Sequence, residues 1–165
     1  EREREESRTR DMAAALGIPK EYGYVVLVLL SYIFLNFWMS FQVGKARKKY
    51  QVFYPTLYAI KSENKDAKLF NCVQRGHQNS LEMMPVFFAT LLVGGLQLPV
   101  IAAGLGAVYT VARFFYFKGY ASGVPENRLR IGGINFLALF GLIILTAAFA
   151  VSLILDVNMQ SRSSS

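Results

Sequence analysis

The sequence predicts an all-α integral membrane protein whose protomer is a four-helix bundle. Three stretches contain no Asp, Glu, Lys or Arg: Tyr22 to Gly44, Met83 to Ala112 and Ile131 to Leu155. A membrane-spanning helix needs about 20 mostly apolar residues, so the middle stretch is long enough for most of two. In lipid each backbone polar group must be paired within its own segment, which favours helices over strands.

A break at Gln97-Leu98-Pro99 divides the middle stretch into two helices. Proline lacks a backbone N–H and its ring clashes with the preceding turn, so a helix ends before it. The spanning domain is therefore expected over residues 19–155. We expect residues 1–18 to be a disordered extension, and residues 1–11 could be a remnant of expression. Residues 156–165 are expected to be a polar tail.

Basic residues gather in two of the three connections between these helices. They are Lys45, Arg47, Lys48, Lys49, Lys61, Lys65, Lys68 and Arg75 around the first connection, and Arg113, Lys118, Arg128 and Arg130 around the third. The positive-inside rule places both on the cytosolic side and both termini on the other. Topology and contact with lipid headgroups explain most of the lysines but need not explain the arginines. The net charge of +7 is therefore no sign of a nucleic-acid partner, and none is expected.

Thiol and metal chemistry have little support in the composition. The chain has one cysteine, Cys72, and one histidine, His77. A single thiol cannot build an intramolecular disulfide framework, and one His excludes two-His metal motifs. The sequence predicts no metal site.

Two polar faces interrupt the apolar helices. On the second helix, offsets of four and seven from Arg75 place Asn79 and Glu82 on its face. On the third helix, offsets of four, seven and eleven from Tyr109 place Arg113, Tyr116 and Tyr120 on one face with it. Ionisable groups in membrane helices are costly and usually face a partner or a cavity.

Two interpretations of these faces remain open at this point. One is a helix-end network or a buried ion pair, either Arg75–Glu82 or Arg113–Glu82. The other is a polar pocket, in which arginine binds carboxylates, glutamate binds an ammonium and asparagine binds a peptide amide. A small zwitterionic peptide would match that set, and a phospholipid headgroup would also fit.

Three motifs carry a family resemblance. They read KARKKY at Lys45–Tyr50, FNCVQRGHQNSLE at Phe70–Glu82 and RFFYFKGY at Arg113–Tyr120. Together they closely resemble the MAPEG family (membrane-associated proteins in eicosanoid and glutathione metabolism), and the resemblance extends from about Pro19 to Leu155. It implies a homotrimer in the endoplasmic reticulum membrane, with lumenal termini and with the cosubstrate glutathione held between protomers near the cytosolic face.

The resemblance also implies residue roles. Arg75, Asn79 and Glu82 would grip glutathione, joined by Arg47, His77, Tyr116 and Tyr120. Arg128 would activate the thiol, with Tyr116 as the second catalytic residue. The chain departs from the family pattern in three ways: Met83 replaces a tyrosine, Lys48 replaces a second arginine, and a longer loop leaves Arg130 as a competitor to Arg128.

The implied activity is that of a glutathione transferase, with a peroxidase activity as an extension. A thiol of pKa about 8.5 is only slightly ionised at neutral pH, and a nearby guanidinium lowers that pKa. The thiolate would attack a lipophilic electrophile arriving from the bilayer or reduce a lipid hydroperoxide. The alternatives are a non-catalytic lipid-binding or lipid-presenting protein of the same fold, and a structural bundle or small channel.

Overall fold

The computed structural model describes residues 1–2, 4–5, 7–8, 15 and 17–163, with side chains as far as Leu155. Its helices are α2 (Tyr22–Tyr50), α3 (Ala67–Gln97), α4 (Pro99–Ala121), the short 3-10 helix η1 (Pro125–Leu129) and α5 (Ile134–Ser163). Four of them are long and apolar enough to cross a membrane. The predicted all-α four-helix fold and the break at Pro99 are therefore confirmed.

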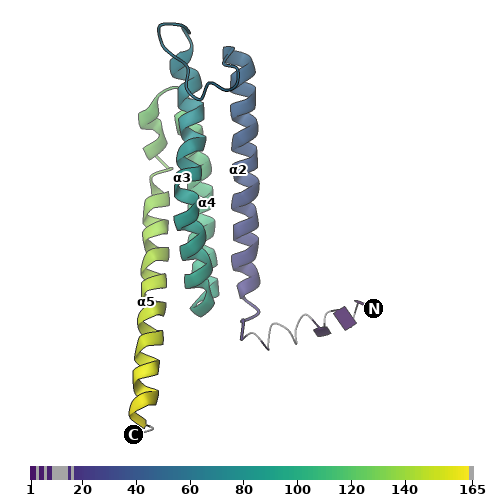
Figure 1. Cartoon of the computed structure of the whole chain (residues 1–165), viewed down its shortest axis with the longest axis vertical. Helices are drawn as coiled ribbons and strands as arrows, with labels where there is room; N and C mark the ends of the chain where they lie inside the picture. Colours follow the sequence, from purple (N-terminus) through teal and green to yellow (C-terminus); the bar gives the residue numbers. More distant parts are fainter. Residues whose placement is uncertain (3, 6, 9–14, 16, 164–165) are drawn as a thin grey trace.

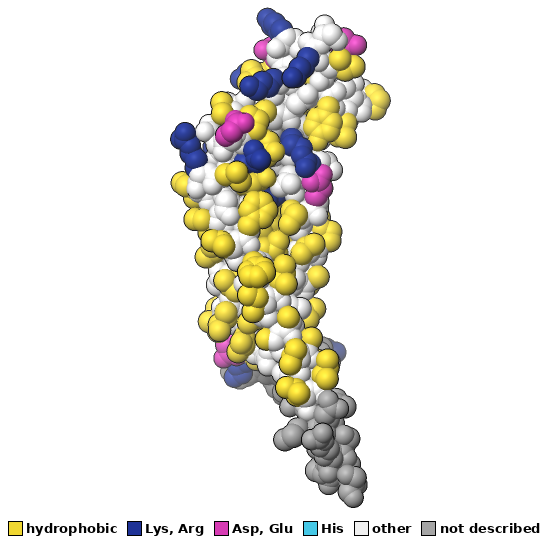
Figure 2. Space-filling model, turned by 90° about the vertical axis from the view of Figure 1, so that its left-hand side faces the viewer, with side chains coloured by type: hydrophobic (Ala, Val, Ile, Leu, Met, Phe, Trp, Pro, Cys, Tyr) yellow, Lys and Arg dark blue, Asp and Glu magenta, His cyan; other side chains and the backbone are white. Residues whose placement is uncertain are grey.

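The helices run side by side and alternate in direction (Figure 1). The connection between α2 and α3 lies at the same end as η1, and the two chain termini lie at the opposite end. Figure 2 shows Lys and Arg side chains gathered near the end that holds the α2–α3 connection and η1, above a broad hydrophobic band. This arrangement agrees with the predicted clustering of both basic connections on one side.

Helix ends differ from those predicted. The first basic motif, Lys45–Lys49, lies inside α2, and α3 begins at Ala67 and so includes Lys68. Arg75 lies on α3, as its spacing predicted. Arg113 lies on α4, as the spacing of the third-helix face predicted, and α4 also includes Lys118. Lysine and arginine are good helix formers, and their long side chains reach polar surroundings from the end of a membrane helix, so loss of apolar character did not mark the ends.

The terminal segments also differ in part from their predictions. The backbone of α5 stays helical as far as Ser163, through most of the predicted polar tail. Residues 2, 4, 5, 7, 8 and 15 have helical backbone, whereas residues 3, 6, 9–14 and 16 lie outside the described residues. The expected disorder of residues 1–18 therefore stays a prediction.

The core beneath the polar faces is aromatic. Tyr32 of α2 packs on Phe87 of α3 at 4.7 Å, and Phe87 stacks on Tyr109 of α4 at 4.1 Å between ring centroids. Small residues let the helices approach closely, which is how helices associate in lipid. A Cβ on Gly106 would lie 2.8 Å from side-chain atoms of Leu91 and Val28. Gly104 is an exception, because open space surrounds it.

The connection between α2 and α3 is tied down at both ends. The Asn71 side chain accepts a hydrogen bond from the Ala59 N–H (2.8 Å) and donates one to the Ala59 carbonyl (2.9 Å). Arg47 Nη1 donates to the carbonyls of Thr56 (2.8 Å) and Val52 (3.3 Å). These contacts hold the connection as a fixed cap over the helix ends.

Candidate active site

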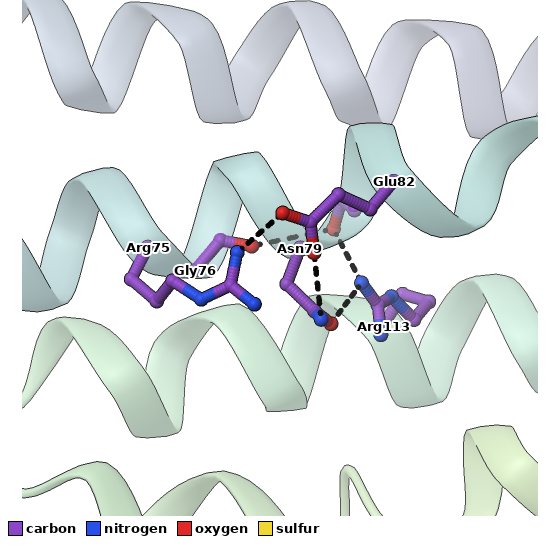
Figure 3. A network of polar contacts seen from close by, with 6 residues as sticks. Arg75, Gly76, Asn79, Glu82 and Arg113 are labelled. Carbon is purple, nitrogen blue, oxygen red and sulfur yellow. Dashed lines mark hydrogen bonds and ion pairs between the residues drawn. The ribbon is translucent and has the colours of Figure 1, made fainter. Parts of the chain in front are cut away.

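The predicted face of α3 forms a polar network (Figure 3). Arg75 Nη1 and Glu82 Oε1 make an ion pair of 2.6 Å, and Asn79 Nδ2 lies 3.5 Å from Glu82 Oε2. The ion pair is not buried, because the side chains of Arg75 and Glu82 are 40% and 44% exposed. The helical spacing thus brought the three residues together as predicted, with their charged ends on the surface of the protomer.

Arg113 of α4 completes this network from inside the bundle. Its side chain is fully buried, and Nη2 donates to Asn79 Oδ1 and to Ser80 Oγ, both at 3.0 Å. Arg113 therefore reaches Glu82 through Asn79. Its Nε and Nη1 have no hydrogen-bond partner among the described residues. A buried guanidinium with free donors strongly favours an acceptor, so Asn79 Oδ1 is held and its amide group is fixed toward Glu82.

A row of aromatic rings continues from Arg113 toward η1. The Arg113 guanidinium lies 4.6 Å from the ring centre of Tyr116, which meets Tyr120 edge-on at 5.5 Å. The Arg128 guanidinium lies 5.1 Å from the ring centre of Tyr120. The two polar faces are thus parts of one strip that runs from Glu82 to Arg128.

Arg128 and Arg130 differ in their surroundings. Arg128 is half-buried beside Tyr120, and its Nη1 donates to the Pro125 carbonyl at 2.7 Å. Arg130 is exposed. A guanidinium held by a carbonyl and a ring is better oriented than one free in solvent. This difference favours Arg128 over Arg130 as the candidate for thiol activation.

Two glycines let the chain around Arg128 approach α4. A Cβ on Gly119 would lie 2.6 Å from backbone atoms of Arg128 and Asn127, and a Cβ on Gly132 would lie 2.5 Å from Tyr116 Cα. Backbone atoms cannot swing aside as side chains do. Gly119 and Gly132 therefore set the distance between α4 and the segment that carries Arg128.

Replacing Gly119 with alanine should force this segment away from α4. We expect Gly119→Ala to cost about 1–3 kcal/mol, the usual range for overpacking. The matched control is Gly104→Ala on the same helix, which meets open space and should be neutral or stabilising by up to about 1 kcal/mol. Thermal unfolding in detergent measures both, and equal midpoints would contradict the close approach at Gly119.

Two predicted site residues lie away from this strip within the protomer. Arg47 is buried beneath the α2–α3 connection, with its guanidinium 4.1 Å from the ring centre of Tyr54. His77 is half-buried on α3. Since successive helical residues turn by about 100°, His77 points away from the face of Arg75 and Asn79. Met83, where the family has tyrosine, packs against the aromatic core.

Sequence reasoning missed Ser80, Gly119 and Gly132. Ser80 shares Arg113 with Asn79, and its carbonyl accepts from the Tyr32 hydroxyl at 3.1 Å. Ser80 directly follows Asn79, and this neighbouring hydroxyl could have been considered as a second hydrogen-bond acceptor for the Arg113 guanidinium. The two glycines gave no such signal, because their role depends on how η1 folds back.

The strip can bind a small ligand that carries several charges. It offers guanidinium groups for carboxylates or a thiolate, the Glu82 carboxylate for an ammonium and the Asn79 amide for a peptide group. A family model matches residues 25–148 and is described as the MAPEG family. The chain belongs to the MAPEG family. This assignment confirms the resemblance found in the three sequence motifs.

Several MAPEG relatives have established names. Microsomal glutathione S-transferase 2 from Homo sapiens is 32% identical over 130 residues, which cover 76% of this chain and 83% of the relative. The Bos taurus protein of the same name is also 32% identical over 130 residues, with 76% and 84% covered. Leukotriene C4 synthase from Rattus norvegicus is 36% identical over 109 residues, covering 66% and 68%.

Proposed function

We propose that this MAPEG protein is a membrane glutathione transferase that activates the glutathione thiol for attack on lipophilic electrophiles. The observation that carries the proposal is the continuous strip from Glu82 through Asn79 and Arg113 to Arg128. Its chemical groups match a tripeptide with two carboxylates, one ammonium and one thiol. The names of the relatives, glutathione S-transferase and leukotriene C4 synthase, support the same activity class.

Recognition of glutathione would exchange existing contacts for new ones. The Arg75–Glu82 pair is solvent-accessible, so each partner can turn to a ligand group of opposite charge. A carboxylate of glutathione would bind Arg75, and the ammonium of glutathione would bind Glu82. Asn79, held by Arg113, would bind a peptide amide. Tyr116 and Tyr120 form the wall between these groups and Arg128.

We assign thiol activation to Arg128, with Tyr116, the next ring of the strip beyond Tyr120, as the second catalytic residue. A guanidinium stays protonated at any physiological pH, so it stabilises a thiolate without exchanging its own proton. Each unit by which the thiol pKa falls corresponds to about 1.4 kcal/mol of preferential binding of the thiolate. The same thiolate could reduce a lipid hydroperoxide, which gives the proposed peroxidase activity. Attack on the outer peroxide oxygen would release the alcohol and leave glutathione as its sulfenic acid, and a second glutathione thiol would then form glutathione disulfide and release water.

We also assign the active form to a homotrimer with the site between protomers. Glu82 lies midway along a membrane-spanning helix and is exposed on the protomer surface. A charge there is costly against lipid and needs a protein or water-filled surrounding. A neighbouring protomer would provide this cover, and it would also bring in Arg47 and His77, which lie off the strip in one protomer. The proposed setting is the endoplasmic reticulum membrane, with the basic end cytosolic.

Equilibrium binding of glutathione to the purified protein in detergent tests the proposal. We expect saturable binding of glutathione. We also expect conjugation of glutathione to a soluble aromatic electrophile, at a rate proportional to the protein concentration. An analogue in which a methyl group replaces the thiol should compete for binding but form no conjugate. Absence of glutathione binding would overturn the proposal and favour a non-catalytic lipid-presenting protein or a channel. Binding without conjugation or peroxide reduction would overturn only the enzymatic part.

A further inference from the structure

A pocket that several basic residues line lies near the basic end of the bundle, outside the strip. It has a volume of about 210 Å³ and lies between α2 and α4. The residues that line it include three lysines and two side chains with further hydrogen-bond donors: Lys45, Lys49, Lys118, Gln42 and Trp38. Nothing in the proposed glutathione reaction uses this pocket.

The charges of this pocket are of one sign. No acidic residue is among the described residues that line it. The ion pair of the site, Arg75–Glu82, involves none of the pocket lysines. Like charges held close together repel each other, and an anion among them would remove that cost. The pocket is therefore complementary to a compact anionic group.

The depth of the pocket corresponds to the boundary of the apolar band. Lys45 comes directly after the charge-free stretch that ends at Gly44. Trp38 packs against Phe114 (5.2 Å) and Phe117 (5.4 Å between ring centroids). Tryptophan is enriched where a membrane protein meets the headgroup region. The lysines thus lie at the level where lipid phosphates are found.

An apolar surface continues from the pocket toward the middle of the bundle. Offsets of three, seven and ten from Lys118 lead to Phe115, Val111 and Val108 on the same face of α4. These side chains are 41%, 58% and 47% exposed. A ligand bound by the lysines could therefore lay hydrocarbon along α4.

We propose that this pocket binds the phosphate-bearing headgroup of an anionic phospholipid, whose acyl chains lie on the exposed face of α4. Lysine clusters beside a membrane helix are typical of sites for anionic lipids. The volume is below the roughly 300–1,000 Å³ of pockets for whole drug-sized ligands, as expected when only the headgroup enters. The apolar surface below favours a lipid over a soluble phosphate. This inference does not depend on glutathione binding.

Fluorescence quenching provides a direct test, because Trp38 is the only tryptophan of the chain and it lines the pocket. The protein is placed in zwitterionic phosphatidylcholine nanodiscs that contain a small fraction of brominated lipid. Brominated phosphatidylserine should quench Trp38 more than brominated phosphatidylcholine at the same mole fraction. Soluble glycerophosphoserine added in excess should leave the quenching unchanged.

A pair of charge-matched variants makes the test specific. The pocket variant is Lys45→Gln/Lys49→Gln/Lys118→Gln. Its control removes three exposed lysines outside the pocket, Lys61→Gln/Lys65→Gln/Lys68→Gln. One lysine near an anionic surface contributes about a fivefold change in affinity. The affinity of the pocket variant for phosphatidylserine, relative to phosphatidylcholine, should therefore fall by roughly a hundredfold.

The control variant should keep most of the preference for phosphatidylserine. Three outcomes would overturn the proposal: equal quenching by both lipids in the unaltered protein, equal loss in the two variants, or an unchanged preference in the pocket variant. Displacement of the lipid by soluble glycerophosphoserine would instead assign the pocket to a free phosphate ester and would overturn the lipid assignment. Thermal unfolding of both variants confirms that they are folded.

Discussion

Replacing Arg128 with alanine should lower turnover about 10–100-fold at neutral pH while leaving glutathione affinity largely intact. The magnitude corresponds to a loss of about one to two pKa units of thiol activation. Affinity should survive because Arg75, Asn79 and Glu82 do not contact Arg128. Steady-state kinetics, equilibrium binding and the ultraviolet absorbance of the thiolate together separate these two effects.

The control for this variant is Arg130→Ala, which removes the same charge two residues along the chain. Arg130 is exposed, so its loss should change turnover less than about twofold, in line with a surface substitution. If Arg130→Ala lowers turnover and Arg128→Ala does not, the assignment between the two arginines is reversed. If neither variant lowers turnover, the proposal that this segment activates the thiol is wrong.

Replacing Arg113 with methionine should weaken glutathione binding by roughly 10–150-fold. A hydrogen bond to a charged group contributes about 1.5–3 kcal/mol, and Asn79 would lose the partner that fixes its amide. We assign Arg113 a positioning role, since its guanidinium is fully buried and donates to Asn79 and Ser80. Methionine suits the buried position in length and flexibility, and it removes the guanidinium nitrogens Nε and Nη1, which have no hydrogen-bond partner among the described residues.

A double-mutant cycle tests whether Arg113 acts through Asn79. We expect Arg113→Met/Asn79→Ala to bind glutathione about as weakly as Asn79→Ala alone, because the second change removes nothing further. Ser80→Ala, which removes the other acceptor of Arg113 Nη2, should have a smaller effect on affinity. Fully additive losses in the double variant would contradict the positioning role and indicate that Arg113 meets the ligand directly.

Much of the fold could be predicted because lipid imposes few solutions. Long charge-free stretches must be helices, and Pro99 must end one of them. The α3 face was predictable for the same reason, since helical spacing alone places Arg75, Asn79 and Glu82 on one side. The observed ion pair of Arg75 and Glu82 was one of the two pairings considered, and Arg113 turned out to reach Glu82 only through Asn79.

Other features depend on contacts that a linear pattern does not contain. The helices continue through Lys45–Lys49 and begin before Lys68, because basic side chains do not stop a helix at the membrane boundary. The position of Arg128 depends on η1 folding back onto Gly119. Spacing along the chain cannot place a residue in such a return segment. Nor could it place Arg47, whose guanidinium is held by carbonyls of the α2–α3 connection.

Fixed cations in this membrane bundle are proposed to hold glutathione as its thiolate. The most direct measurement is the ultraviolet absorbance of bound glutathione thiolate as a function of pH in the unaltered protein. We predict a titration midpoint below the thiol's usual value of about 8.5, so that the thiolate predominates above the lowered midpoint and is lost as the pH falls through it. A midpoint at or above about 8.5 with glutathione bound would contradict the account.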